Sequence, residues 1–232
     1  RKRLIRDSRV LGTRHLVEGI AAADPRPRVL LSASAVGYYG DREEILDESA
    51  GPGEDFLAGV VKAWEDEAAK AEALGLRVIL LRIGVVLARD GGALAKMLPA
   101  FRMGVAGRLG HGRQGMPWVH VDDVVGLILH ALDHPEIRGP VNAVAPEIVD
   151  NAGFTRALGK ALHRPTVLPA PGFMLRLALG EMAGVLLGGQ RLVPRVAERT
   201  GYQFRHPELT EALGSLLANP TGPDPATERA SS

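Results

Sequence analysis

The stretch VLLSASAVGYYG, residues 29–40, decides the fold of this chain. It begins with the strand formers Val29, Leu30 and Leu31 and then changes to small and hydroxyl-bearing side chains, followed by two tyrosines and a glycine. A buried parallel strand has this composition when its carboxyl end opens into a ligand crevice. The interior needs branched apolar residues, whereas the mouth needs small side chains and hydrogen-bonding groups. We therefore expect a parallel sheet with a ligand site at the end of this strand.

Strands and helices alternate on both sides of this stretch. Apolar periodicity predicts helices near residues 5–23, 55–73, 93–102, 122–132 and 152–162, and strands near residues 28–36, 77–83, 117–121 and 140–144. This alternation is typical of an α/β protein with a doubly wound parallel sheet. After Arg164, prolines separate short segments rich in Leu, Ala and Met. We expect a sheet domain over residues 1–149, a small, mainly helical lobe over 150–217 and a disordered tail over 218–232.

Bulk composition excludes several classes of function. The net charge of +1 over 232 residues does not favour nucleic acid or an anionic membrane as a partner. No cysteine is present, which removes thiolate chemistry, cysteine metal sites and disulfides. No apolar run reaches the roughly 18 residues that a spanning helix requires. We expect a cytoplasmic protein that acts on a small molecule.

Hydroxyl groups gather where the first strand ends. Ser32 and Ser34 alternate with alanines, including Ala33, and each could bind a substrate oxygen or serve only for close packing. Tyr38 and Tyr39 follow, and either phenol could act as an acid near the crevice or pack within the loop. We take Ser34 and the two tyrosines as candidate catalytic residues.

Arg82 interrupts an apolar strand, and His120 precedes two aspartates. A buried guanidinium must find a partner, because leaving it unpaired costs several kcal/mol. Either a structural carboxylate or a ligand would therefore meet Arg82, and we favour the ligand. A metal site at His120 would need more ligands converging on it, so the sequence predicts no metal site.

A literal G-x-G-x-x-G occurs at Gly110, Gly112 and Gly115. The dinucleotide fingerprint follows a strand and opens a helix, so that the phosphates meet the amino end of that helix. Here an extended segment, PWVHV, follows instead. We interpret the glycines as part of a loop on the substrate side, where Arg108, Arg113 and Gln114 could reach an anionic group. A solvated loop without a ligand is the alternative.

Several longer segments resemble one protein family. The segments SASAVGYYG, LLRIGVVL and WVHVDDVVGLILHAL occur in an order that resembles the extended short-chain dehydrogenase/reductase superfamily. The chain is most similar to its atypical epimerase-family branch (NAD-dependent epimerase/dehydratase-like), through DGGALAKMLPAF, the loop containing GHGRQ and the pattern of residues 151–182. That branch carries a C-terminal domain of unknown function. The resemblance covers about residues 4–217 and implies a Rossmann-like fold.

This resemblance implies that the first strands of the fold, with the pyrophosphate-binding turn, precede Arg1. The chain would then hold the nicotinamide and substrate half of the site. On this basis the segment from Ser32 through Ala33 to Ser34 flanks the nicotinamide, and Arg82 contacts the cofactor. We expect NADP rather than NAD, and the family suggests a possible homodimer through the helix near 55–73.

The superfamily's Tyr-x-x-x-Lys proton relay is missing from the helix that follows the serine strand. Alignment on Glu65 puts Leu57 and Val61 in the two places, and alignment on Lys62 puts Ala58 in the tyrosine place. Two functions therefore stay open. One is an NAD(P)-dependent oxidoreductase or epimerase that acts on a sugar-nucleotide-like or other hydroxylated substrate. The other is a cofactor-binding but catalytically silent regulatory or partner-binding protein.

Overall fold

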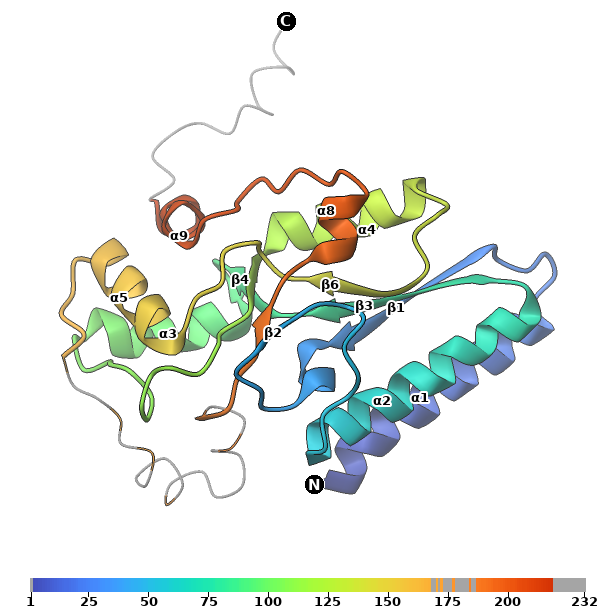
Figure 1. Cartoon of the computed structure of the whole chain (residues 1–232), viewed down its shortest axis with the longest axis horizontal. Helices are drawn as coiled ribbons and strands as arrows, with labels where there is room; N and C mark the ends of the chain where they lie inside the picture. The colour runs from blue at the N-terminus through green and yellow to red at the C-terminus, as the bar shows by residue number, and fades with distance from the viewer. Residues whose placement is uncertain are drawn as a thin grey trace, which may run out of the picture.

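The structure is a computed structural model that describes residues 2–167, 170, 172, 177, 184 and 187–218 (Figure 1). Its elements are α1 (Lys2–Ala22), β1 (Val29–Ala35), η1 (Val36–Tyr39), β2 (Ile45–Leu46), α2 (Phe56–Ala69), η2 (Lys70–Leu74), β3 (Arg77–Ile83), β4 (Val85–Ala88), α3 (Gly92–Arg102), β5 (Trp118–His120), α4 (Val121–Asp133), β6 (Gly139–Ala143), α5 (Asn151–Ala161), β7 (Arg191–Leu192), α8 (Arg195–Arg199) and α9 (Leu209–Leu217). The predicted disordered tail lies, apart from Ala218, outside the described residues. No helix in the described part combines the length and apolar character needed to cross a membrane.

The central sheet consists of β1, β3 and β6, all parallel, with β3 in the middle. The register aligns Ser34 with Arg82 and Arg82 with Asn142. Three polar residues therefore form one row across the sheet, close to the carboxyl ends of its strands. This is the edge at which open α/β sheets bind ligands.

Helices cover both faces of this sheet (Figure 1). On one face α1 and α2 lie side by side, and a cluster that includes Val17, Leu30, Ala68 and Val78 fills the space beneath them. On the other face α4 and α8 pack over a second cluster around Leu81. The α/β doubly wound architecture predicted from the alternation of elements is thus confirmed.

A third apolar cluster joins elements that are distant in the sequence. It unites Phe101 of α3 and Trp118 of β5 with Phe154 of α5 and Leu213 of α9. Residues after 150, which the sequence predicts as a separate lobe, therefore contact the sheet domain through a shared core. The described part of this segment also contains the strand β7, which pairs in parallel with β2.

Two local features shape the chain around β4 and β5. The strand β3 ends at Ile83, as predicted, and the apolar run continues as β4 after Gly84, where a Cβ would lie 2.6 Å from the Pro117 carbonyl oxygen. The chain turns at this point, and β4 pairs with β5 as a separate small parallel sheet. The helix α4 begins directly after β5, and His120 caps it, since its Nδ1 accepts the N–H of Asp122 at 3.0 Å.

Candidate functional site

The polar row at the carboxyl edge of the sheet is organised by a carboxylate from α2. Glu65 makes a bidentate pair with Arg82, with Nε to Oε1 at 2.9 Å and Nη2 to Oε2 at 2.8 Å. The Ser34 hydroxyl donates to Glu65 Oε1 at 2.5 Å. All three side chains are buried. Because the Ser34 hydroxyl donates its proton in this hydrogen bond, the remaining lone pairs of its oxygen can only accept hydrogen bonds.

Tyr39 extends this network toward β6 and is fully buried. Its hydroxyl accepts a hydrogen bond from Arg82 Nη1 at 2.9 Å and donates to Asn142 Oδ1 at 2.8 Å. Burial raises the pKa of Tyr39 to about 12, although the neighbouring Arg82 opposes the shift. The phenol is therefore neutral at physiological pH, and its O–H group already donates a hydrogen bond to Asn142.

Glu48 closes the network on the side of the C-terminal segment. Its Oε1 accepts the backbone N–H groups of Asn142 and Val196 at 3.0 and 3.1 Å. The Asn142 amide nitrogen in turn donates to the Val193 carbonyl at 3.0 Å. Burial raises the pKa of Glu48, and these backbone donors counter part of the rise. The segment around residues 193–196 is thereby joined to the end of β6.

Tyr38 occupies a different position from Tyr39. Its ring lies on the guanidinium of Arg82, with Cζ 3.5 Å from the ring centroid, which is a cation–π arrangement. Its side chain is only partly buried, and its hydroxyl has no hydrogen bond within the described part of the chain. Asp66 raises the pKa of Lys62, and the charges of Tyr38 and Glu65 add to this effect. Tyr38 is thus the phenol that remains available to a ligand, with a lysine in electrostatic range.

We predict an alkaline loss of stability that Tyr39 causes. Its pKa is about 12 in the folded protein and about 10 for an unburied tyrosine. The folded state holds this proton more tightly, so the stabilisation is complete below pH 10 and is lost as the pH rises toward 12. Urea unfolding at several alkaline pH values should show this decline, and Tyr39→Phe should flatten it. An equally steep decline in Tyr39→Phe would assign the effect to other groups.

The residues predicted to flank the nicotinamide lie at the free edge of β1. Ser32 is partly buried, and its hydroxyl donates only to the adjacent Ala33 carbonyl at 3.2 Å. Ala33 is exposed. This edge therefore presents a surface of small side chains beside the buried Ser34, whereas Arg82 lies beneath Tyr38 and is held by Glu65.

The residues predicted for the substrate are arranged around the amino end of α5. Arg108 and Arg113 are exposed, whereas Gln114 is buried and donates to the Leu109 carbonyl within the same loop. The Asn151 side chain accepts the N–H of Leu109, which fixes the loop against the start of α5. The structure does not join these residues to the network around Glu65.

Two further arginines that the sequence analysis did not select line a cavity next to this loop. Arg156 of α5 and Arg191 of β7 border a cavity of about 320 Å³ together with Ile148, Val149, Asp150 and Gly153. Neither guanidinium has a hydrogen bond or an ion pair to a described residue. The cavity lies beyond the carboxyl end of β6. The residue after Arg191 is Leu192, which packs in one cluster with Tyr39.

Two family models match this chain. The model of the NAD dependent epimerase/dehydratase family matches residues 2–144, and a domain of unknown function, DUF1731, matches residues 170–216. An epimerase family protein SDR39U1 homolog from Arabidopsis thaliana is 44% identical over 93% of this chain, which spans 63% of that relative. An epimerase family protein from Mycobacterium leprae is 42% identical over 95% of this chain and is covered to 72%.

A crystal structure of the human epimerase family protein SDR39U1 with NADPH has a similar fold. It superposes with a TM-score of 0.84 at 34% sequence identity. The match covers 92% of this chain and 73% of the human chain. The similarity thus extends over nearly all of the present chain, which is shorter than each of these relatives.

Proposed function

This chain belongs to the NAD dependent epimerase/dehydratase family, and from that premise we propose that it takes part in hydride transfer between NADPH and an anionic, hydroxylated small molecule. The observation that carries the proposal is the buried row of Ser34, Arg82 and Asn142 at the carboxyl edge of the sheet. Glu65 and Tyr39 make this row rigid, and Tyr38 is left open above it. Two reactions fit this proposal. One is a net oxidation or reduction of the substrate, and the other is an epimerisation in which the hydride returns to the substrate.

We assign the nicotinamide to the carboxyl end of β1, where the small side chains of Ser32 and Ala33 would let a flat ring approach the sheet. The human relative that was crystallised with NADPH supports the choice of NADPH over NADH. When bound, the nicotinamide supplies the hydride chemistry, while the protein supplies orientation and charge.

The side chains at this edge suggest how a proton would move. The Ser34 hydroxyl donates its hydrogen bond to Glu65, so its oxygen could accept a hydrogen bond from a substrate O–H and orient that group. The Tyr38 hydroxyl, which makes no hydrogen bond to a described residue, can give or take the reacting proton. Tyr38 would thus take the place of the tyrosine in the missing Tyr-x-x-x-Lys relay from a different position in the chain.

The substrate class follows from the cavity beside α5. Arg156 and Arg191 line it without an ion pair to any described carboxylate, whereas Asp150, which also lines it, accepts the N–H of Gly153. Paired guanidiniums recognise phosphate or carboxylate groups. We therefore expect a substrate with an acidic group, such as a nucleotide sugar, a sugar phosphate or a hydroxy acid. The acidic group would occupy the cavity while a hydroxyl group reaches Ser34 and Tyr38.

We predict that Arg191→Met raises KM for such a substrate about tenfold to a hundredfold, because a charged hydrogen bond contributes about 1.5–3 kcal/mol. The protein would be incubated with NADP⁺ or NADPH and a panel of acidic hydroxylated compounds. Absorbance of the reduced nicotinamide reports net oxidation or reduction. NMR of the product reports epimerisation, which leaves no net change in the nicotinamide.

Arg195→Met provides a matched control. Arg195 lies four residues away, is exposed and pairs with Glu198 at 3.3 Å, outside the cavity. The KM of the Arg195→Met variant for acidic substrates should equal that of the wild type. A KM for acidic substrates that Arg191→Met leaves unchanged would contradict the assignment of the cavity.

A catalytically silent, cofactor-binding protein is the second candidate. This alternative is favoured because the hydroxyl groups of Ser34 and Tyr39 already donate hydrogen bonds, to Glu65 and Asn142 respectively. Tight NADPH binding without turnover on any panel compound, and without an effect of Ser34→Ala, would support this alternative. A cytoplasmic location and a homodimer through α2 stay predictions.

A further inference from the structure

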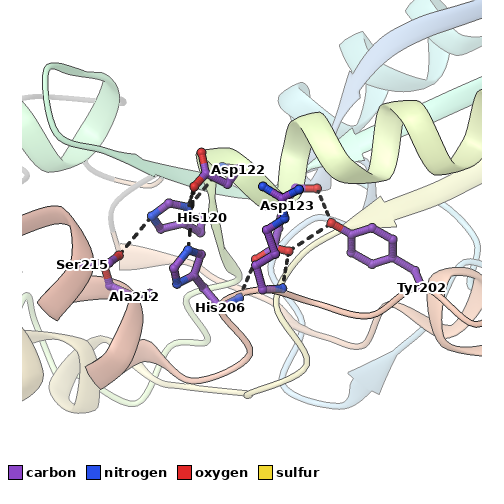
Figure 2. A network of polar contacts seen from close by, with 8 residues as sticks. His120, Asp122, Asp123, Tyr202, His206, Ala212 and Ser215 are labelled. Atoms are coloured by element: carbon purple, nitrogen blue, oxygen red, sulfur yellow. Dashed lines mark hydrogen bonds and ion pairs between the residues drawn. The ribbon is translucent and has the colours of Figure 1, made fainter. Parts of the chain in front are cut away.

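A second polar cluster lies where β5 meets the start of α4 and the segment after α8. The proposed function does not use it. His120 ends β5, Asp122 lies in the first turn of α4, and His206 follows α8 (Figure 2). One ligand atom from each lies within 4.8 Å of the other two. This is the one group of three potential metal ligands among the residues that the structure describes.

The three side chains face a cavity of about 490 Å³. The segment Ala88–Gly91 and residues Ser215 and Leu216 complete its walls. The cavity lies beyond the carboxyl ends of the parallel strands β4 and β5, so the cluster is accessible to small solutes. His120 is 3% exposed, whereas the Asp122 side chain is 52% exposed.

A buried carboxylate places His206 in the cluster. Asp123 is fully buried and accepts the backbone N–H groups of Arg205 and His206 at 2.8 and 3.0 Å and the Tyr202 hydroxyl at 3.0 Å (Figure 2). These bonds fix the chain at residue 206 against the start of α4. The imidazole of His206 then stacks on that of His120, with ring centroids 3.8 Å apart.

The hydrogen bonds exclude a serine nucleophile at this place. Ser215 lies 3.3 Å from His120 Nε2, which resembles part of a Ser-His-Asp triad. However, His120 Nδ1 accepts the N–H of Asp122, so the proton of the ring is on Nε2. The Ser215 proton points to the Ala212 carbonyl at 2.8 Å. His120 therefore cannot act as a base toward Ser215.

We propose that His120, Asp122 and His206 form a binding site for a divalent transition metal such as Zn²⁺, with the open coordination positions facing the cavity. Two imidazoles and one carboxylate are donors that Zn²⁺, Co²⁺, Ni²⁺ and Cu²⁺ prefer. The Asp122 Oδ2 atom lies 3.7 Å from His120 Nδ1 and 3.8 Å from His206 Nε2. Ligand atoms in a tetrahedral zinc site lie roughly 3.4 Å apart, so small side-chain shifts complete the site.

Metal binding would change one existing contact. His120 Nδ1 now accepts the N–H of Asp122, and coordination would direct this lone pair to the metal instead. Bound metal would connect the start of α4 to the C-terminal segment.

The test is a titration of the purified, metal-free chain with CoCl₂, followed by visible absorption. We expect one saturable equivalent that ZnSO₄ displaces. His206→Gln and Asp122→Asn should each weaken binding at least about tenfold. Asp122→Asn changes a half-exposed side chain and keeps the backbone N–H that caps the helix, so it preserves the fold if His206→Gln does not.

His134→Gln is the matched control. His130 and His134 stack with the same 3.8 Å between ring centroids, but they lack a third ligand among the described residues. This variant should bind Co²⁺ like the wild type, and Zn²⁺ should raise its Tm as it raises that of the wild type. Absence of saturable binding, or binding that both His206→Gln and Asp122→Asn leave unchanged, would overturn the proposal.

Discussion

Replacing Glu65 by alanine should lower the free energy of unfolding by about 3–5 kcal/mol, because it leaves the guanidinium of Arg82 buried without its carboxylate. Arg82 is 3% exposed; its Nε and Nη2 donate to Glu65, whereas its Nη1 donates to Tyr39. The Ser34 hydroxyl also loses its acceptor. Urea denaturation at neutral pH measures the loss, and the Glu65→Ala curve should keep the slope of the wild type.

Two controls identify the cause. Glu67→Ala removes a carboxylate from the same helix. Its partners Arg14 and Lys70 have side chains 45% and 59% exposed to water, so neither charge is left buried, and the loss should be about 1 kcal/mol or less for each pair. The double variant Glu65→Leu with Arg82→Met removes both charges, and its stability should recover most of the loss. A double variant as unstable as Glu65→Ala would show that packing, rather than the unpaired charge, determines the effect.

Tyr38→Phe should lower kcat by about 10² to 10⁴ on any substrate that the protein turns over, since this is the usual contribution of a general acid. The hydroxyl of Tyr38 has no hydrogen bond to a described residue, whereas that of Tyr39 bonds to Arg82 and Asn142. Removal of the Tyr38 hydroxyl also breaks none of the described hydrogen bonds, so stability should stay near that of the wild type. Initial rates with NADPH and a turned-over substrate measure the effect.

The neighbouring tyrosine supplies the comparison. Tyr39→Phe should keep kcat within a few fold while reducing stability, because its hydroxyl serves the buried network. The pH dependence of kcat should also change in Tyr38→Phe and not in Tyr39→Phe. The reverse result, with the larger rate loss in Tyr39→Phe, would make the buried phenol the proton donor.

The sequence predicts the fold well because the sheet is built from local signals. The change from Leu31 to the hydroxyl-bearing residues marks the carboxyl end of β1, and Arg82 interrupts β3 at the same level. Because β1 and β3 are parallel neighbours, their carboxyl ends lie side by side. The family resemblance is confirmed by the matching family models and relatives.

The partners of these residues were harder to predict. Glu65 interrupts the buried face of α2 between Val61 and Ala68, just as Arg82 interrupts the buried strand. This shared pattern was a usable signal, and it points to the structural carboxylate that the sequence analysis left as the alternative. By contrast, Arg191 and His206 reach their positions through long-range docking of the C-terminal segment. No local pattern contains that information.

The return of the C-terminal segment to the sheet has a consequence for biosynthesis. Val193 and Val196 bond to Asn142 and Glu48, so the closing contacts of the carboxyl-edge network join residues about 50 and 150 positions apart. While the ribosome still holds residues 190–200 in its exit tunnel, the nascent chain can form the Arg82–Glu65 pair but not this closure. Emergence of residues 190–200 from the tunnel is therefore the step at which a co-translational intermediate can close this network.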